Sequence, residues 1–144
     1  MSKKPSVSIL IASFNKEKFV KRCLNSCLKQ DYNNLEVIFY DDGSKDNSYD
    51  IAKKTKGIKA FKNIQKKKLS KFNTYHQISS YNKALSKSKG EYILLLDSDD
   101  FFKKNKVKTI VEYFTKNPKS NIVFDLPIYY YSKSRQIYVK NTER

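Results

Sequence analysis

The chain of 144 residues lacks the features that mark several common classes of protein. It has three glycines, at positions 43, 57 and 90, so neither the GxGxxG fingerprint of dinucleotide-binding proteins nor the GxxxxGK(S/T) loop of P-loop enzymes is present. It has one histidine, His76, so no catalytic triad with a histidine base is convincing, and we expect His76 on a loop or a helix surface. No apolar run approaches the ~20 residues that a membrane-spanning helix requires.

Cysteine is also scarce, and its spacing excludes the usual metal and redox motifs. Cys23 and Cys27 are four residues apart in a helical pattern, so they form no CxxC pair, and no set of His and Cys residues completes a zinc site. We expect both thiols to pack in the core of a protein kept in the reducing cytosol. The opening MSKKPSVSILIASFN loosely resembles a signal peptide, but its apolar stretch is short, which favours a buried first strand.

Acidic residues are outnumbered, and the net charge is +16 at pH 7. Such a surface attracts phosphate groups of nucleic acid, anionic lipid or nucleotides, although lysines spread along a chain also serve as solvated surface. The dense cluster QKKKLSKF at 65–72 lacks the repeated aromatic residues of a single-strand binder. No helix-turn-helix or RNP pattern occurs either, which argues against nucleic acid as a partner. We expect this cluster either to dock on an anionic membrane surface or to be a solvated loop.

Apolar residues recur with strand and helix periods in alternation along the chain. Buried strands are predicted at 7–13, 35–42 and 91–97, a weaker strand at 58–63, and late strands at 121–131 and 136–140. Helices are predicted at 15–30 with Asn15 as N-cap, from Ser44 or Asp46 to about Gly57, at 75–90 up to Gly90, and at 105–117. This alternation predicts a one-domain α/β fold with an open, mostly parallel sheet and helices on both faces.

Polar residues follow three of these strands at their carboxyl ends. The strand ends carry Ser13, Phe14 and Asn15, then Asp41 and Asp42, and finally Asp97, Ser98, Asp99 and Asp100. Because the carboxyl ends of parallel strands share one rim, where open α/β sheets bind ligands, we expect the acids to converge. Convergent carboxylates favour Mg²⁺ or Mn²⁺, which share phosphate oxygens. The alternative is that residues 97–100 cap the next helix, for which one acid would suffice.

Two segments carry a resemblance to a known family. PSVSILIASFNKEKFVKRCLNSCLKQDYNNLEVIFYDDGSKDNS, at 5–48, resembles the opening of family-2 glycosyltransferases of the GT-A fold, which is Rossmann-like. NKALSKSKGEYILLLDSDD, at 82–100, resembles their second block, which ends in the metal-binding DxD motif. The resemblance extends from about residue 5 to 126, and the two blocks in this order and spacing make it specific.

The resemblance implies the substrate, the cofactor and the site. The donor would be a nucleoside-diphosphate sugar, UDP-linked in most of the family, and the cofactor Mn²⁺ or Mg²⁺. Asp42 would hydrogen-bond the base, usually uracil, with Asp41 in support. Asp97 would contact the ribose or the sugar, and Asp99 would ligate the metal. Further donor-binding residues implied are Ala12, Ser13, Phe14, Asn15, Asn82 and Ser98.

The chain departs from the family pattern in two places. The family often has an Arg-Asn pair in the helix before the DxD motif, with a glycine a few residues earlier. Here Tyr81 precedes Asn82, and the nearest glycine before Tyr81 is Gly57. The family's general base, an acid, lies beyond residue 144, and the late acids match no base position: Glu112, Asp125 and Glu143. We therefore assign no catalytic residue and expect residues 1–144 to be a donor-binding domain without the acceptor-binding part.

The resemblance implies an inverting glycosyltransferase of bacterial type. It would act in surface-polysaccharide or lipid-linked glycan synthesis, on a glycan or lipid-linked acceptor, in the cytoplasm or on the inner face of the cell membrane. A truncated, non-catalytic module for nucleotide binding or membrane docking is one alternative. A nucleotidyltransferase is another, although its usual glycine-rich loop after the first strand is absent from SFNKEKF.

Overall fold

The described residues form four strands and four helices in strict alternation. A computed structural model describes residues 4–64 and 73–124. The elements are β1 (Val7–Ser13), α1 (Glu17–Leu28), β2 (Leu35–Asp41), α2 (Ser48–Lys54), β3 (Ile58–Lys62), α3 (Asn73–Leu85), β4 (Tyr92–Asp97) and α4 (Lys106–Lys116). All eight were predicted from the sequence, with differences confined to their ends.

Strand β1 lies inside the sheet, which explains its apolar sequence. The strand order is β3-β2-β1-β4, and every pair is parallel. All seven residues of β1 are buried, because strands flank it on both sides and helices cover both faces. Its β-branched Val7, Ile9 and Ile11 suit a pleated, buried strand. The prediction of an open parallel sheet is confirmed.

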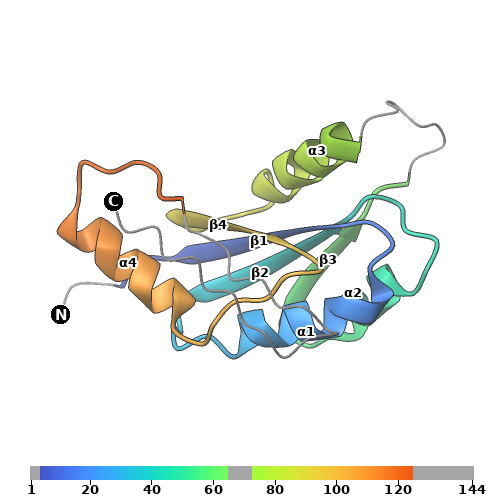
Figure 1. Ribbon diagram of the computed structural model, residues 1–144, viewed down its shortest axis with the longest axis horizontal. Coiled ribbons are helices and arrows are strands. Elements are labelled where there is room, and N and C mark those ends of the chain that lie inside the picture. Colours follow the sequence, from blue (N-terminus) through green and yellow to red (C-terminus); the bar gives the residue numbers. More distant parts are fainter. Residues whose placement is uncertain (1–3, 65–72, 125–144) are drawn as a thin grey trace, which may run out of the picture.

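Successive residues of β1 point to opposite faces of the sheet, and each face has its own helices (Figure 1). Val7, Ile9 and Ile11 pack in the main core with α1, α2 and α4. Leu10 belongs to a smaller cluster on the other face, with Ile38 of β2 and Ala84 of α3. Helices therefore lie on both faces of the sheet, as predicted.

Helix α1 carries both cysteines into the main core. Cys23 and Cys27 are fully buried and free. The hydrogen bond with Cys27 and burial raise the pKa of the Cys23 thiol well above its ordinary value. The Cys23 thiol therefore stays protonated. Both cysteines pack in the core as small apolar side chains, which confirms their predicted place.

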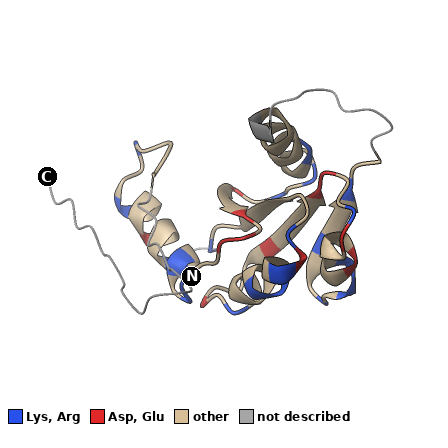
Figure 2. Cartoon of the chain, turned by 45° about the vertical axis from the view of Figure 1, so that its right-hand side comes forward, with Lys and Arg blue, Asp and Glu red and all other residues tan. Residues whose placement is uncertain are grey.

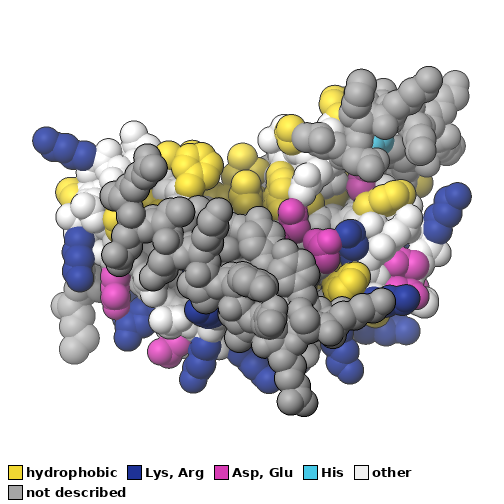
Figure 3. Space-filling view, viewed as in Figure 1, with side chains coloured by type: hydrophobic (Ala, Val, Ile, Leu, Met, Phe, Trp, Pro, Cys, Tyr) yellow, Lys and Arg dark blue, Asp and Glu magenta, His cyan; other side chains and the backbone are white. Residues whose placement is uncertain are grey.

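The α3 face of β4 is only partly covered. Ile93 and Leu95 of β4 are 37% and 57% exposed, and Ile78 and Leu85 of α3 are also exposed. Figure 3 shows hydrophobic side chains gathered between α4 and α3, over β4. Because β4 is the last strand of the described sheet, its outer edge has no strand beside it there.

Gly90 does not end α3, which already ends at Leu85, contrary to the prediction. It lies instead where the chain passes directly over β1. Its N–H donates to Oγ of Ser8 at 2.8 Å, and a Cβ at this position would lie 2.4 Å from the backbone nitrogen of Ser8. Glycine is required here because the two backbones approach too closely for a side chain.

The late strands find no support in the described residues. Residues 121–124 are not in a strand, so the prediction is wrong for them, and the rest of both predicted strands lies outside the described residues. Within residues 4–64 and 73–124, no helix has the length and apolar character needed to cross a membrane.

Candidate functional site

The carboxyl ends of β1, β2 and β4 lie side by side at one rim of the sheet. Ser13 is in register with Asp41, and Ala12 with Asp97. Beyond the strands, the N–H of Asp42 donates to the carbonyl of Ser13 at 2.8 Å. The N–H of Ser98 likewise donates to the carbonyl of Ala12 at 3.2 Å. The rim thus brings together two acidic loops from distant parts of the sequence, as predicted.

Asp41 shapes the loop after β2. Its side chain is fully buried, and Oδ1 accepts the backbone N–H groups of Gly43 at 3.0 Å and Ser44 at 2.7 Å. Gly43 has a φ of +86°, a backbone conformation that other residues adopt only with strain. Asp41 therefore holds the backbone that presents Asp42.

Asp42 lies between Asn63 and His76, neither of which was predicted from the sequence to be at the site. Nδ2 of Asn63 donates to its Oδ1 at 2.9 Å. Nδ1 of His76, in α3, lies 2.9 Å from its Oδ2, and the side chains of His76 and Asp42 are only 17% and 6% exposed. His76 was expected in a loop or on a helix surface. It does lie on a helix, but its side chain is shielded and faces the site, contrary to the expectation of a surface residue.

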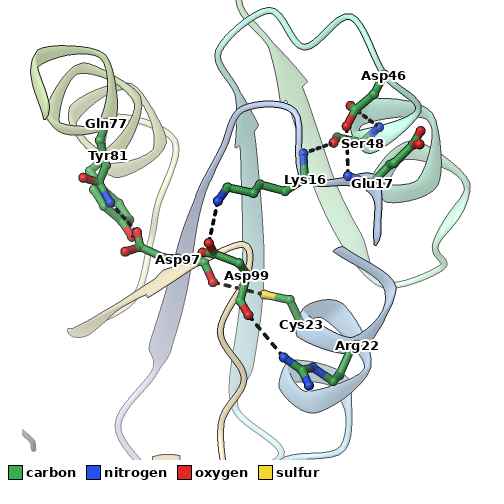
Figure 4. A network of polar contacts seen from close by, with 10 residues as sticks. All are labelled: Lys16, Glu17, Arg22, Cys23, Asp46, Ser48, Gln77, Tyr81, Asp97 and Asp99. Carbon is green, nitrogen blue, oxygen red and sulfur yellow. Dashed lines mark hydrogen bonds and ion pairs between the residues drawn. The ribbon is translucent and has the colours of Figure 1, made fainter. Parts of the chain in front are cut away.

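Asp97 is held by the same helix, one turn further along (Figure 4). Its Oδ1 accepts from Nε2 of Gln77 and from the hydroxyl of Tyr81, each at 2.6 Å. Burial and the hydrogen bond to Asp97 raise the pKa of Tyr81, so its hydroxyl stays a donor at neutral pH. Tyr81, which stands where the family often has arginine, thus fixes the acid that was predicted to contact ribose or sugar.

Asp99 already accepts a cation. Nζ of Lys16, at the start of α1, lies 2.5 Å from its Oδ2, and Nη2 of Arg22 donates to its backbone carbonyl at 3.3 Å. The pKa of Asp100 is raised by partial burial and by the negative charges of Asp99 and Asp97. The loop therefore concentrates negative charge, and basic side chains from α1 offset it (Figures 2 and 4).

These residues fit a divalent cation that takes few ligands from the protein. Within the described part of the chain, no three His, Cys, Asp or Glu side chains gather into a metal cage. Mg²⁺ does not need one, because it is usually held by one or two carboxylates together with waters and substrate phosphates. The carboxylate of Asp99 is 40% exposed and already pairs with an ammonium group, so it is able to accept a cation.

The other predicted site residues fall into two groups. Phe14 is half exposed at the rim, and Asn15 has a φ of +52°, which only a few residue types tolerate. Ser98 is buried beside Ala12. Asn82, in contrast, contacts none of the described acids; it lines a shallow hollow of about 410 Å³ on α3, together with residues such as Tyr75 and Ser79.

The loops before α1 and α2 cap one another, which differs from the predicted caps. Asn15 was predicted to cap α1, but the N-cap is Lys16, and Oδ1 of Asn15 accepts the N–H of Lys45. The side chain of Asp46 serves both helices: its Oδ2 accepts the N–H of Glu17, the first residue of α1, at 3.0 Å, and its Oδ1 accepts that of Ser48, the first residue of α2. Neither it nor Ser44 is the N-cap of α2, which is Asn47.

Replacing Asp46 by alanine is expected to destabilise the protein by about 1–2 kcal/mol at pH 7, because two helix-terminal N–H groups lose their acceptor. Burial opposes ionisation of Asp46, but hydrogen bonds from Ser48 and Glu17 outweigh it and lower its pKa. The stabilisation is therefore complete above the ordinary pKa of about 3.9 and is lost as pH falls through the lower folded-state pKa. Urea unfolding at pH 7 and pH 3 measures this.

The control for Asp46→Ala is Asp31→Ala, which removes the same charge at an exposed position whose side chain has no described hydrogen bond. We expect it to change the free energy of unfolding by less than about 0.5 kcal/mol. If Asp46→Ala lowers the free energy of unfolding by the same amount at pH 3 as at pH 7, the ionised side chain of Asp46 does not cap the helices as assigned.

Comparison with known proteins identifies the family. A family model described as Glycosyl transferase family 2 matches residues 8–143. The chain belongs to this family. The predicted resemblance is thus confirmed, and the nucleotidyltransferase alternative is dropped.

The family relatives come from several bacteria. The chain is 33% identical over 106 residues to the glycosyltransferase GlyG of Streptococcus pneumoniae, which covers 74% of this chain and 34% of that protein. It is 36% identical over 113 residues to the hyaluronan synthase of Pasteurella multocida, covering 78% of this chain and 11% of the synthase. The chain thus spans about a third, or less, of the length of these relatives.

Solved structures of glycosyltransferases with the GT-A fold share the architecture. S. aureus TarS 1-349 in complex with UDP-GlcNAc has a TM-score of 0.65 and 27% identity, over 77% of this chain and 31% of that one. The mannosyltransferase PcManGT of Pyrobaculum calidifontis, in complex with GDP-Man and Mn²⁺, has a TM-score of 0.66 at 19% identity, over 78% and 33%. At that identity the second likeness shows the fold alone. The predicted GT-A fold is confirmed.

Proposed function

We propose that this family-2 domain binds a nucleoside-diphosphate sugar, UDP-linked, at the rim formed by β1, β2 and β4. The base would lie at Asp42, the ribose or sugar at Asp97, and the diphosphate next to Asp99. The observation that carries the proposal is the convergence of the two acidic loops, from 41–44 and 97–100, in a chain of this family. The complex of TarS with UDP-GlcNAc supports a UDP-linked donor.

The chain's own residues can hold the donor in distinct ways. The backbone of residues 12–15 would line the pocket, and Ser98 would support it from below. Lys16 and Arg22 lie beside Asp99 and supply positive charge for phosphate oxygens. Bound at Asp99, Mn²⁺ or Mg²⁺ would neutralise the charge that develops on the departing diphosphate. Asn82 has no described contact that supports its predicted role.

The proposed reaction is an inverting sugar transfer. An acceptor hydroxyl, deprotonated by a base, attacks the anomeric carbon, and the bond to the diphosphate breaks. Glu112 is exposed on α4 and is not part of the rim, whereas Asp125 and Glu143 lie outside the described residues. We assign the general base to none of the described residues and propose that residues 1–144 make up the donor-binding portion.

The setting we propose is the synthesis of a bacterial surface polysaccharide or a lipid-linked glycan. The acceptor would be a glycan or a lipid-linked glycan, met in the cytoplasm or at the inner face of the membrane. The hyaluronan synthase relative supports a polysaccharide product. Docking of the basic cluster at 65–72 on anionic lipid stays a prediction, because the cluster lies outside the described residues.

A thermal-shift panel of nucleotide sugars tests the proposal. UDP-, GDP- and CDP-linked sugars are each added to the 144-residue chain with and without Mn²⁺. A ligand at about 100 times its dissociation constant adds about 2.7 kcal/mol of stability, which is easily measured. We expect UDP-sugars to stabilise the chain most, and more with Mn²⁺. No stabilisation by any nucleotide sugar would refute the proposal.

Asp42→Asn is expected to weaken uridine binding with or without metal. A carboxylate that accepts a base N–H makes a charge-assisted bond, worth about 1.5–3 kcal/mol. Calorimetry with UDP measures the loss, and Asp50→Asn, an exposed acid of α2, is the charge-matched control. Equal UDP affinity in the wild type and in Asp42→Asn would remove Asp42 from the site.

A further inference from the structure

Lys16 links the segment that follows β2 with the loop that follows β4 (Figure 4). Its backbone N–H donates to Oγ of Ser48 at 2.8 Å, and the N–H of Asn15 donates to Oγ of Ser44 at 2.8 Å. Both serines come after β2 in the chain, so the backbone of Lys16 is fixed on that side. Its ammonium group reaches the other side, where Nζ lies 2.5 Å from Oδ2 of Asp99. A positive charge with a fixed base is thus placed on the carboxylate that we propose as the metal ligand.

Two cations contact Asp99, and they are held differently. Nη2 of Arg22 donates to the backbone carbonyl of Asp99, and its Cζ lies 4.4 Å from the ring centroid of Phe101, so neither of these contacts uses the carboxylate. The ammonium group of Lys16 has one hydrogen bond in the described part of the chain, to the carboxylate of Asp99, and its side chain is 38% exposed. A lysine carries a compact charge on a flexible stem, so this group can turn to another anion while its backbone stays in place.

The carboxylate of Asp99 cannot serve an ammonium group and a divalent ion well at the same time. Its two oxygens belong to one small group, so an ion on either of them would lie next to Nζ of Lys16, and like charges repel. A diphosphate bound beside Asp99 would offer the ammonium group other charged acceptor oxygens. Binding of the diphosphate would therefore free the carboxylate for the ion.

We infer that Lys16 is an exchangeable cation of the site, which occupies the carboxylate of Asp99 in the free protein and moves to the diphosphate when a nucleotide binds. The inference rests on the proposed function and adds to it a residue that makes metal binding depend on the nucleotide. Because such coupling is reciprocal, the ion strengthens nucleotide binding by the same factor. The free protein would then take up little metal until a nucleotide is present.

Titration of the 144-residue chain with Mn²⁺, followed by the electron paramagnetic resonance of the unbound ion, tests the inference. Each chain is titrated without nucleotide and at saturating UDP, and a titration without protein measures the Mn²⁺ that free UDP holds. Calorimetry gives the UDP affinity without metal. The variants are Lys16→Met, which removes the charge, and Lys16→Gln, which removes it with a polar side chain and decides the matter if Lys16→Met does not fold.

The control is Lys18→Met, because Lys18 is exposed in the first turn of α1 and the substitution removes the same charge from the same helix end. Thermal unfolding of each variant checks that it folds. We expect Lys18→Met to leave the Mn²⁺ and UDP affinities within about twofold of the wild type, since salt screens an exposed charge that is not in contact with the site.

We expect Lys16→Met to change metal binding and nucleotide binding in opposite directions. Without nucleotide it should bind Mn²⁺ about fivefold more tightly, which is the upper range for loss of an exposed ion pair. Without metal it should bind UDP about tenfold more weakly, because a charge-assisted hydrogen bond to phosphate is lost. At saturating UDP its Mn²⁺ affinity should match that of the wild type, so the enhancement of Mn²⁺ binding by UDP should fall about fivefold.

Four results would each overturn the inference while the proposed function stands. The first is an unchanged or undetectable Mn²⁺ affinity of the nucleotide-free Lys16 variants. The second is an equal gain in Mn²⁺ affinity with and without UDP, which would mean that Lys16 only repels the ion. The third is the same gain in Lys18→Met, and the fourth is unchanged metal-free UDP binding in the Lys16 variants. A wild-type chain that binds no UDP, with or without Mn²⁺, would overturn both the inference and the proposed function.

Discussion

Asp99→Asn is expected to abolish the part of UDP binding that depends on Mn²⁺ or Mg²⁺. Hard cations require anionic oxygen ligands, and the carboxylate of Asp99, in the loop that follows β4, is 40% exposed. Loss of groups that only support a metal ligand costs about 10–100-fold in metal affinity, so loss of the ligand itself should cost at least about 100-fold. Calorimetry with UDP, with and without Mn²⁺, measures the effect.

The fold should survive Asp99→Asn, because the Lys16–Asp99 pair is well exposed and such pairs contribute about 0–1 kcal/mol. Metal-free UDP binding should persist, since Lys16 loses its carboxylate partner and remains available to phosphate. Asp50→Asn removes the same charge from an exposed position on α2 and should keep the full Mn²⁺ enhancement. If Asp99→Asn also keeps it, the metal lies elsewhere.

Gly90→Ala is expected to cost at least about 3 kcal/mol of folding stability. The added Cβ would lie 2.4 Å from the nitrogen and 2.5 Å from Oγ of Ser8, and 2.7 Å from the carbonyl carbon of Val7. Two of these three atoms belong to the backbone of the central strand, which cannot move without disturbing both of its neighbours. Overpacking that side chains can absorb already costs about 1–3 kcal/mol.

Urea unfolding of the wild type, Gly90→Ala and Lys89→Ala measures this cost. Lys89 is exposed, and only its backbone N–H is engaged, with Oε1 of Glu36, so alanine there should change stability by less than about 0.5 kcal/mol. If Gly90→Ala and Lys89→Ala unfold at the same urea concentration, the loop before β4 can move away from β1.

The sheet and its acidic rim could be predicted because they depend on local patterns. Buried strands can be recognised in the sequence as apolar, β-branched runs, and the acids at 41–42 and 97–100 come at the ends of such runs. Parallel topology then brings their carboxyl ends together without any further information. The roles assigned to Asp42, Asp97 and Asp99 stay predictions, although the structure now gives each of them a defined surrounding.

The partners of those acids could not be predicted, because they depend on how α3 packs. Ile78 and Leu85 of α3 are exposed, whereas the small side chains of Ser80 and Ala84 are fully buried, so α3 turns its small residues towards the sheet. Small side chains allow α3 to lie close to the sheet, and this rotation brings Gln77 and Tyr81 to Asp97. Small residues at positions 80 and 84, with Tyr81 beside them, were the available signal.

The mutual capping of α1 and α2 was missed for a related reason. Asn15 and Asp46 are both acceptable N-caps in sequence terms, and each was assigned to its own helix. In the structure Asn15 bonds the loop before α2, and Asp46 bonds the first residues of both helices, because parallel topology places the amino ends of α1 and α2 next to one another. Local rules recognise a capping residue but not which helix it caps.

The position of β1 inside the sheet also delays the completion of its pairing during synthesis on the ribosome. β1 is synthesised before both of its neighbours, and its pairing with β4 joins Val7 to Tyr92, about 85 positions later. At about 5–20 residues per second, roughly 4–17 s pass before that partner exists. During this interval β1 can pair with β2 on one side only, and its other edge is a template for strands of other chains. Production of the protein should therefore depend on early shielding of this edge, for instance by a chaperone that binds nascent chains.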